Sequence, residues 1–326
     1  MPETSHLRPL GATDIRISSV AMGCWPIAGM TSLGVTREDS LATLRAALDS
    51  GVNFFDTAYA YGVHGESERL IGEALGAHRD EIVVATKAGL HWDAAGSSRV
   101  WDARPETLKK QCEESLQRLG FDNADLLYLH APDPNTPIEE SAGALRELMQ
   151  QGKARAIGAS NLSLEQLKAF HAVCPLSAYQ PPYNMLQREI EADILPWCRN
   201  NQISTVVYWP LLKGLLAGKL PRDHQFDAKD GRTKYPMFQG EEWHKNQDFV
   251  ERLREIAEES NVTVAELVVN WTIEQPGIDS ALCGAKRAYQ IEESAAAMRW
   301  RLSDRQREQI EQALQDRGAP LSVPAV

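Results

Sequence analysis

The sequence predicts a (β/α)8 barrel, and three observations support this fold class. Eight short apolar segments have the length and composition of strands buried in a parallel sheet. Amphipathic segments with helix start and stop signals lie between them. The composition does not change along the 326 residues, a length that suits one barrel with insertions. We therefore expect a single domain over residues 1–326, with strands at 19–24, 52–57, 81–87, 125–130, 154–160, 176–180, 204–210 and 280–285.

Three of the connecting segments carry clear helix signals. Thr36 and Asp39 have the spacing of a capping box at the start of one helix. Pro105 and Pro137 open two others, because proline is well tolerated at a helix start. A glycine follows the last apolar residue of each segment, as is common just past a helix end.

Three further segments are expected to be additions to the barrel. Residues 1–18 contain a pattern typical of a β-hairpin, which we expect to cover the lower mouth of the barrel. Residues 212–245 include a long polar loop after the seventh strand, and loops of this length often cover a functional site. Residues 318–326 are predicted to be a loose tail.

Composition excludes several classes of partner. A net charge of −11 argues against a nucleic acid or an anionic membrane as the main partner. The five cysteines are scattered, which is typical of a reducing compartment. The sequence shows neither a secretory signal nor an apolar run approaching the ~18 residues of a membrane span. We therefore expect a cytoplasmic protein. The eight histidines show no metal-ligand spacing, so no metal is expected. The sequence predicts no oligomeric state.

Polar side chains end nearly every predicted strand. Asp56 ends the second strand, and an unpaired buried carboxylate is costly. Lys87 ends the third strand, and neighbouring strands lie only ~4.8 Å apart, so its ammonium group can neutralise Asp56. Active sites of (β/α)8 barrels lie at this end of the strands. The fourth to seventh strands add His130, Ser160, Asn161, Gln180 and Tyr208.

Each of these residues also has an ordinary structural explanation. One Asp–Lys pair between adjacent strands is more often a packing salt bridge than a catalytic pair, and His130 alone fits either role equally well. Tyr61 alone would more often be a loop aromatic. Their convergence on one face of the barrel favours a functional site.

The motifs that carry these residues resemble those of a known enzyme family. In chain order they are DTAYAYG (56–62), ATKAG (85–89), LLYLHAPDP (126–134), GASN (158–161), YQPPYN (179–184) and GLLAGK (214–219). Along nearly its whole length the chain is similar to aldo-keto reductases of the long-loop, NADPH-dependent type. The resemblance implies a catalytic tetrad of Asp56, Tyr61, Lys87 and His130, with NADPH bound in an extended form.

The chemistry of carbonyl reduction is consistent with this tetrad. Hydride adds to the carbonyl carbon, and the oxygen needs a proton from a positioned acid. Tyrosine has an unperturbed pKa of ~10, and a nearby ammonium group lowers it. We assign Tyr61 as the general acid, Lys87 as the group that lowers its pKa, and Asp56 as the carboxylate that holds Lys87. His130 would orient the substrate carbonyl.

The cofactor must be held without a G-x-G-x-x-G motif, which the chain lacks. The resemblance implies that Ser160, Asn161 and Gln180 hold the nicotinamide carboxamide and that Tyr208 stacks on its ring. Lys286 and Arg287 precede a predicted helix, an arrangement that favours an anion. The resemblance implies that this anion is the 2′-phosphate, which favours NADPH over NADH. The other positions implied are Trp209, Pro210, Leu211, Leu215, Lys219, Arg232, Gly284, Gln290, Glu293 and Ser294.

Two of these positions depart from the family pattern. Trp209 stands where the family commonly has a serine that touches the pyrophosphate, so backbone amides of residues 211–215 are expected to replace that contact. Ser294 stands where the family usually has asparagine, which predicts a weaker contact to the adenine.

Aromatic residues on the loops above the first three strands are expected to form the substrate pocket. Such a pocket suits small aromatic or apolar aldehydes and ketones. Its predicted residues are Trp25, Met30, Tyr59, His91, Trp92 and Trp101.

Three other functions fit parts of the sequence. Lys87 at a strand end could form a Schiff base, as in barrel aldolases. A metal-dependent hydrolase is less favoured, because ligand spacing is absent. A cofactor-sensing subunit of a membrane channel, with little turnover, would share the family motifs.

Overall fold

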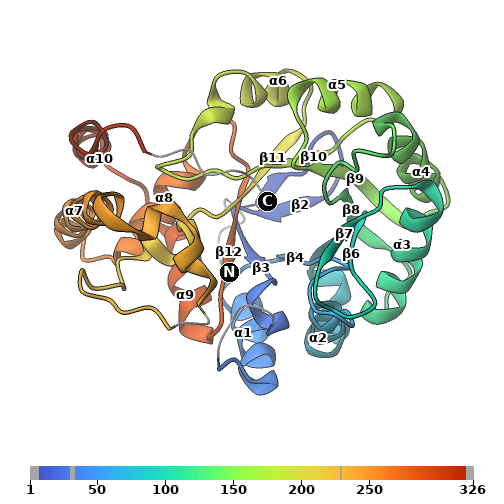
Figure 1. The fold of residues 1–326 in the computed structure, drawn as a ribbon, viewed down its shortest axis with the longest axis horizontal. Coiled ribbons are helices and arrows are strands. Elements are labelled where there is room, and N and C mark those ends of the chain that lie inside the picture. The colour runs from blue at the N-terminus through green and yellow to red at the C-terminus, as the bar shows by residue number, and fades with distance from the viewer. Residues whose placement is uncertain (1–6, 30–33, 228–229, 321–326) are drawn as a thin grey trace.

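The computed structural model describes residues 7–29, 34–227 and 230–320, and its central feature is a closed barrel of eight parallel strands (Figure 1). The predicted fold class is therefore confirmed, and every predicted strand segment overlaps one barrel strand. Around the barrel the strands follow the order β10, β11, β12, β3, β4, β5, β8, β9. Their bounds are β3 Val20–Gly23, β4 Phe54–Asp56, β5 Val83–Ala88, β8 Ala124–Leu129, β9 Ala154–Ser160, β10 Ala178–Gln180, β11 Ser204–Tyr208 and β12 Ser280–Gly284.

Helices surround the barrel, and two more pack outside that ring (Figure 1). The ring contains α1 Arg37–Asp49, α2 Glu66–Leu75, α3 Pro105–Leu119, α4 Ile138–Gln150, α5 Leu164–Val173, α6 Ile194–Asn200, α8 Val264–Ile273 and α9 Ala288–Ala296. The outer pair is α7 Gly240–Glu259 and α10 Asp304–Arg317, which contact each other. The predicted capping box is present at the start of α1, where the Thr36 side chain accepts a hydrogen bond from the Asp39 amide.

Alternation along the strands separates two apolar layers. Phe54 and Leu126 lie in the cluster inside the barrel, whereas Phe55 and Leu127 pack outward against the helices. Successive side chains of a strand point to opposite faces, so the pairing register of the strands determines which residues lie inside the barrel and which lie against the helices. The same register brings the carboxyl ends of β4, β5 and β8 together, because Asp56 pairs with Ala85 and Lys87 with Tyr128.

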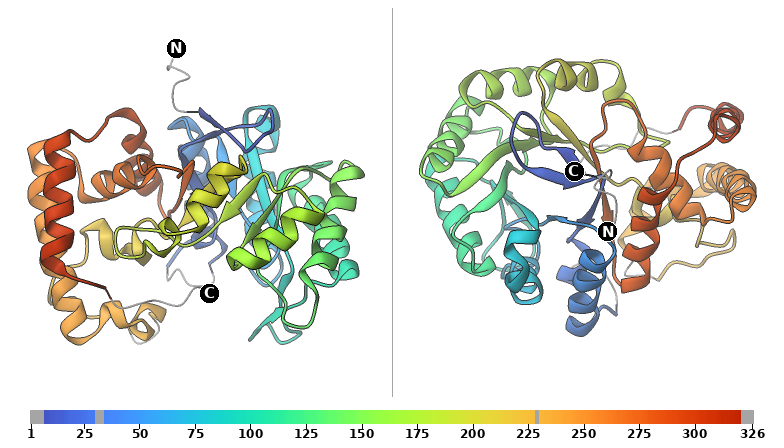
Figure 2. Two further views of the ribbon diagram at one scale, coloured as in Figure 1. Left: turned by 90° about the horizontal axis from the view of Figure 1, so that it is seen from above. Right: turned by 180° about the vertical axis from the view of Figure 1, so that it is seen from behind.

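The predicted N-terminal hairpin is present in the described part of the chain. Strands β1 Leu7–Pro9 and β2 Arg16–Ser18 are antiparallel. Leu10, Ile15 and Ile17 are buried in the inner barrel cluster. Figure 2 shows this hairpin at one end of the barrel and the segment that leads into α7 at the other. Residues 1–6 of the predicted hairpin and 321–326 of the predicted tail lie outside the described residues.

Two segments differ from the expectation of plain loops. Strands β6 Leu90–Trp92 and β7 Arg99–Trp101 form a second antiparallel hairpin after β5. The segment after β11 contains three short 3-10 helices, η5 Leu212–Ala217, η6 Gly231–Lys234 and η7 Pro236–Phe238. Helix α7 then begins at Gly240, so the last six residues of the predicted loop 212–245 are helical. Glu241 and Glu242 favour this helix start, since acidic residues stabilise a helix N-terminus.

No helix within residues 7–29, 34–227 and 230–320 combines the length and the apolar character needed to cross a membrane.

Candidate active site

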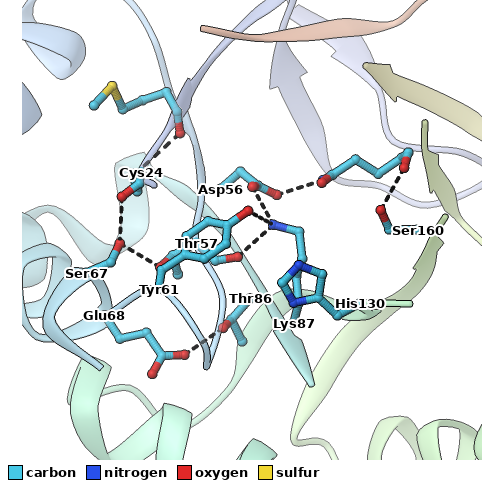
Figure 3. Close-up of polar contacts among 12 residues, drawn as sticks. Cys24, Asp56, Thr57, Tyr61, Ser67, Glu68, Thr86, Lys87, His130 and Ser160 are labelled. Atoms are coloured by element: carbon cyan, nitrogen blue, oxygen red, sulfur yellow. Dashed lines mark hydrogen bonds and ion pairs between the residues drawn. The ribbon is translucent and has the colours of Figure 1, made fainter. Parts of the chain in front are cut away.

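Lys87 lies at the centre of a polar cluster at the carboxyl end of the barrel (Figure 3). Its Nζ donates to Oδ1 of Asp56 at 2.5 Å, to the carbonyl oxygen of Thr57 at 2.8 Å and to Oη of Tyr61 at 3.2 Å. An ammonium group has three hydrogens, so these three acceptors use all of them. Burial alone lowers the pKa of Lys87, but Asp56 and Tyr61 outweigh it and hold that pKa above its usual value. Lys87 is therefore a buried, fully bonded ammonium ion.

Asp56 is the carboxylate that balances this charge. Its Oδ1 accepts from Lys87, and its Oδ2 accepts from Nε2 of Gln180 at 2.8 Å. Burial raises the pKa of Asp56, whereas Lys87 and Gln180 lower it. Because both oxygens already accept hydrogen bonds, the geometry favours the ionised carboxylate. Gln180, predicted to hold the nicotinamide, uses its amide nitrogen to hold Asp56.

Tyr61 contacts Lys87 from the turn that follows β4, and its phenol is buried. Burial raises its pKa above 10; Lys87 acts in the opposite direction, and Asp56 adds to the increase. As expected, Lys87 lowers this pKa, but burial is the larger effect and leaves the pKa above its usual value. The phenol is consequently protonated at neutral pH. Because Lys87 can only donate, the Tyr61 oxygen accepts that bond and its own hydrogen remains available to another group.

His130 follows β8 and lies beside Tyr61, with 5.9 Å between the two ring centroids (Figure 3). Burial, then Lys87, then Arg99 lower its pKa well below 6.5. Its Nδ1 is buried and has no hydrogen-bond partner among the described residues. His130 is therefore a neutral imidazole at physiological pH, able to donate one hydrogen bond.

Ser160, Asn161 and Tyr208 form a hydrogen-bonded chain across neighbouring strand ends. The Ser160 hydroxyl donates to the backbone carbonyl of Gln180 at 2.7 Å. The Asn161 amide donates to the backbone carbonyl of His130 at 3.0 Å, and the Tyr208 hydroxyl donates to Oδ1 of Asn161 at 2.8 Å. Asn161 has φ 60°, a left-handed conformation that asparagine tolerates better than most residues. The structure thus brings these predicted cofactor residues to the same end as Asp56, Tyr61, Lys87 and His130.

The turn after β11 contains a run of left-handed backbone conformations. Leu212, Lys213 and Gly214 have φ 42°, 56° and 89°. The amides of Leu212 and Gly214 donate to the carbonyls of Trp209 and Leu211, at 2.8 Å each, so these two N–H groups are used within the turn. A Cβ at Gly214 would lie 3.7 Å from Nη1 of Arg232, so a cation stands beside the turn. Arg232 also pairs with Asp230 at 2.6 Å. The neighbouring predicted residues are Trp209, Pro210, Leu211 and Leu215, the last of which is buried in the core.

The start of α9 is arranged differently from the prediction. Oε1 of Gln290 accepts the amides of Lys286 at 2.7 Å and Arg287 at 3.2 Å, so this side chain caps the helix. Arg287 pairs with Asp39 of α1 at 2.9 Å and is engaged there. Lys286 stays near Arg232: burial, then Arg232, lower its pKa. Among the two predicted cations, Lys286 is the better placed for an anion.

The remaining residues predicted at the adenine end also have partners within the protein. Lys219 forms an ion pair with Glu293 at 2.6 Å, which joins the segment after β11 to α9. The Ser294 hydroxyl donates to the backbone carbonyl of Gln290 at 3.0 Å. A Cβ at Gly284 would lie 3.0 Å from Cγ of Pro26, so glycine permits the close approach of this loop.

The predicted substrate residues divide into two groups. Trp25 contacts Tyr61 edge-on at 5.1 Å, and Nε1 of Trp92 donates to the carbonyl of Ala60 at 2.9 Å, so both lie near the tetrad. Trp101 is 40% exposed and lies beside Arg99 on β7.

Tyr59 and His91 face α3 instead. The Tyr59 hydroxyl donates to Glu114 at 2.6 Å and its ring lies against Arg118, while Nδ1 of His91 is 3.4 Å from Nε2 of Gln111. Both side chains are thus engaged by α3, and their assignment to the substrate pocket stays a prediction. Met30 lies outside the described residues.

Sequence reasoning missed two kinds of residue at this end of the barrel. The third acceptor of Lys87 is a backbone carbonyl, at Thr57, and backbone groups leave no signal in side-chain patterns. Lys213 and Arg99 lie in segments that were expected to be loops, and a single cation in a loop gives no sequence signal for a site. In the described part of the chain, no group of three or more His, Cys, Asp or Glu side chains is arranged to hold a metal ion.

Comparison with known proteins agrees with this geometry. The model of the aldo/keto reductase family matches residues 19–315. The chain is 38% identical to the aldo-keto reductase YhdN of Bacillus subtilis, covering 93% of this chain and 92% of the relative. It is 35% identical to the NADH-specific methylglyoxal reductase of Escherichia coli, covering 91% and 94%.

Solved structures show the same relationship. The glycerol dehydrogenase of Gluconobacter oxydans superposes with a TM-score of 0.90 and 36% identity, covering 99% of each chain. An aldo/keto reductase of Klebsiella pneumoniae in complex with NADP and acetate superposes with a TM-score of 0.72 and 26% identity, covering 95% of this chain and 94% of that one. The fold, the polar cluster and the family match lead to one conclusion: this chain belongs to the aldo/keto reductase family.

Proposed function

We propose that the protein reduces aldehydes and ketones to alcohols with NADPH, using Tyr61 as the general acid. One observation carries this proposal. The Tyr61 oxygen accepts a hydrogen bond from the buried Lys87 ammonium, and its own hydrogen remains available beside His130. A proton donor, a cation that stabilises the resulting phenolate and a neutral donor for the carbonyl are therefore adjacent.

In the proposed reaction, bound NADPH would supply the hydride to the carbonyl carbon. The neutral imidazole of His130 donates a hydrogen bond that orients the carbonyl. Tyr61 transfers its proton to the carbonyl oxygen as negative charge develops there. Lys87 stabilises the phenolate across 3.2 Å, and Asp56 keeps Lys87 in place. Exchange with solvent then reprotonates Tyr61.

The protonation states support Tyr61 rather than His130 as the acid. The pKa of His130 is lowered well below 6.5, so few molecules carry the proton it would have to give at neutral pH. The phenol is protonated throughout this range, because its pKa is raised. The same reasoning argues against a Schiff-base role for Lys87, since a fully bonded ammonium has no free electron pair for attack on a carbonyl.

NADPH is the cofactor that the charge distribution favours. Lys286 would meet the 2′-phosphate together with Arg232, which also pairs with Asp230. The Klebsiella structure contains NADP, whereas the E. coli relative is named as NADH-specific, so both nucleotides occur among relatives. We expect Lys286→Gln to weaken NADPH binding about tenfold and to leave NADH binding within about twofold. Titration of protein fluorescence with each nucleotide measures this, and equal losses for both would contradict it.

The proposed function extends to the location, the domain organisation and the substrate class of the protein. We place it in the cytoplasm, because all five cysteines are buried and free. We also propose one domain over residues 1–326, since the N-terminal hairpin shares its core with the barrel. Small carbonyl compounds are the proposed substrates, which agrees with the name of the methylglyoxal reductase, while the glycerol dehydrogenase is named for the alcohol side of the same type of reaction.

A coupled screen tests the function directly. Oxidation of NADPH is followed with a panel of aldehydes, ketones and sugars, beside the same panel with NADH. We expect turnover with at least one carbonyl compound. NADPH binding without turnover on the whole panel would contradict the proposal and favour a cofactor-sensing subunit.

A further inference from the structure

Two cations near the tetrad have no role in the proposed reaction. Lys213 follows the first residue of η5, and its Nζ lies 3.7 Å from the ring centroid of Trp209 and 4.3 Å from that of Tyr235. Arg99 begins β7 and lies 5.9 Å from the ring centroid of Trp101. Within residues 7–29, 34–227 and 230–320, no carboxylate forms an ion pair with either cation. Aromatic faces hold an ammonium in a fixed position but leave its charge unbalanced.

Hydrogen bonds and ring contacts connect Lys213 to the tetrad. The ring of Trp209, which lies under Lys213, packs edge-on against Tyr208 at 5.1 Å. Tyr208 donates to Asn161, which donates in turn to the backbone carbonyl of His130. Lys213 is thus separated from His130 by two aromatic residues and one amide.

The β6–β7 hairpin connects Arg99 to the same place. Arg99 pairs with Trp92 in the register of the hairpin. The Trp92 indole donates to the carbonyl of Ala60, the residue before Tyr61. Arg99 is therefore attached to the loop that carries the proposed acid.

The electrostatic effects of these groups agree with their positions. Burial, then Arg99, lower the pKa of Lys213 to about 8. Arg99 also lowers the pKa of His130, after burial and Lys87. Antiparallel partners share one face of a hairpin, so Arg99 lies on the face that Trp92 turns toward Ala60, which agrees with these two effects. Because Asp56 neutralises Lys87, the local excess of positive charge comes from Arg99 and Lys213, in a chain with a net charge of −11.

We propose that Arg99 and Lys213 bind a carboxylate of the substrate, so that the preferred substrates are aldehydes or ketones that carry an acid group. This inference rests on the proposed reductase function and names its substrate class. The guanidinium offers paired donors that match a carboxylate, and the ammonium adds a second charge. In the proposed function the cofactor phosphates have separate cations, Arg232 beside the turn after β11 and Lys286 at the start of α9. The aromatic wall of Trp25 and Trp92 would contact the rest of the substrate.

Two aldehydes of nearly equal shape test this proposal. 4-Formylbenzoate carries a carboxylate, and methyl 4-formylbenzoate carries a neutral ester at the same position. The variants are Arg99→Gln, Lys213→Gln and the double variant, with Arg45→Gln and Lys168→Gln as controls that remove exposed cations from α1 and α5. At pH 7 the wild type is expected to have at least a tenfold higher kcat/KM for the acid than for the ester, an advantage that each single variant lowers about tenfold. In the two control variants, kcat/KM for the acid and for the ester is expected to change by no more than about twofold. The same limit is expected for kcat/KM of the ester in the Arg99 and Lys213 variants.

A binding experiment makes the test independent of turnover. The Kd of 4-formylbenzoate for the complex with NADP+, in which no reduction occurs, is measured by calorimetry for the same variants. Each single variant is expected to weaken binding about tenfold. The Kd of NADP+ itself, measured in parallel, is expected to stay within about twofold of the wild type.

Every other result overturns a defined part of the account. Equal kcat/KM for acid and ester, with unchanged Kd in the variants, would remove the carboxylate site and leave the reductase function intact. A loss of NADP+ affinity equal to the loss of 4-formylbenzoate affinity would assign the two cations to the cofactor phosphates instead. Binding of 4-formylbenzoate that depends on both cations, without reduction of either aldehyde or of the carbonyl panel, would keep the anion site and contradict the reductase function.

Discussion

At the scale of single residues, Lys87 holds the site together. A buried ion pair by itself is weak support for stability, because removing two charges from water costs about as much as their attraction returns. Here the ammonium has two further acceptors, Thr57 and Tyr61, and the carboxylate has Gln180. The cluster therefore tolerates burial because each charge is fully hydrogen-bonded.

Replacing Lys87 by methionine is expected to destabilise the protein by about 3–5 kcal/mol at pH 7, since it leaves Asp56 buried without a cation. Burial then raises the pKa of Asp56 further, because the opposing effect of Lys87 is lost. A raised folded-state pKa means that stability is retained below the unfolded value of about 3.9 and lost as the pH rises through the folded value. The penalty should accordingly be smaller at pH 4 than at pH 7. Urea unfolding at both pH values measures it.

A matched variant separates charge from packing. Adding Asp56→Asn to Lys87→Met removes the stranded carboxylate, so we expect part of the stability at pH 7 to return. A penalty of equal size at pH 4 and pH 7, unrelieved by the second substitution, would show that Lys87 contributes packing rather than charge balance.

The sequence was sufficient to locate Asp56, Lys87 and His130, because strand ends can be recognised from the apolar runs that precede them. It was not sufficient for the sign of the Tyr61 pKa shift. That sign depends on whether burial or the ammonium dominates, and burial arises from the packing of Trp25 and His130 around the ring. Such effects come from the whole fold and have no local pattern.

At the scale of elements, strand β9 supports the site from inside the barrel. Gly158 pairs with Tyr128 on one side and Ala178 on the other. A Cβ at Gly158 would lie 2.4 Å from Cδ1 and Cε1 of the buried Tyr128 ring. The ring itself lies 5.8 Å from Nζ of Lys87. Glycine is thus needed here to seat the ring beneath the ammonium.

Gly158→Ala is expected to cost about 1–3 kcal/mol through overpacking. It should also lower kcat, because a displaced Tyr128 ring moves Lys87. Gly143→Ala is the matched control: a Cβ there meets nothing within 4 Å, and alanine in helix α4 should stabilise by about 0.5–1 kcal/mol. Urea unfolding and kcat, measured on both variants, test whether Gly158 is needed to seat the Tyr128 ring. Equal stability of Gly158→Ala and the wild type would contradict the assignment.

The elements also show where sequence reasoning stops. Barrel strands were predictable because they are continuous apolar runs, and helix α1 because Thr36 and Asp39 cap it. The β6–β7 hairpin was missed although Asp93 to Gly96 is a recognisable turn between aromatic flanks. The predicted loop 212–245 ran six residues into helix α7, because the first turn of that helix is polar and follows other polar residues.

At the scale of the whole molecule, the barrel separates stability from chemistry. The β1–β2 hairpin covers one end, and the polar cluster lies at the carboxyl end of the strands (Figure 2). Ile17 is fully buried against the inner barrel cluster. The hairpin is joined to the inner barrel cluster through apolar side chains such as Ile17.

Ile17→Ala is therefore expected to lower the free energy of unfolding by about 2–5 kcal/mol through the cavity it creates. At temperatures well below unfolding, kcat and KM should stay within about twofold of the wild type. Thermal unfolding and steady-state kinetics on one preparation test this separation. A loss of kcat in the folded variant would mean that the lower end also positions the tetrad.

The central claim is that Tyr61 gives its proton to the substrate carbonyl, and one measurement tests it most directly. The rate of hydride transfer is followed in a single turnover by stopped flow for the wild type, Tyr61→Phe and the control Tyr289→Phe, whose ring is 55% exposed. We predict a loss of about 10²–10⁴-fold in Tyr61→Phe, an unchanged rate in Tyr289→Phe, and a Kd for NADPH within about twofold of the wild type. A Tyr61→Phe rate close to that of the wild type, with cofactor bound, would contradict the account.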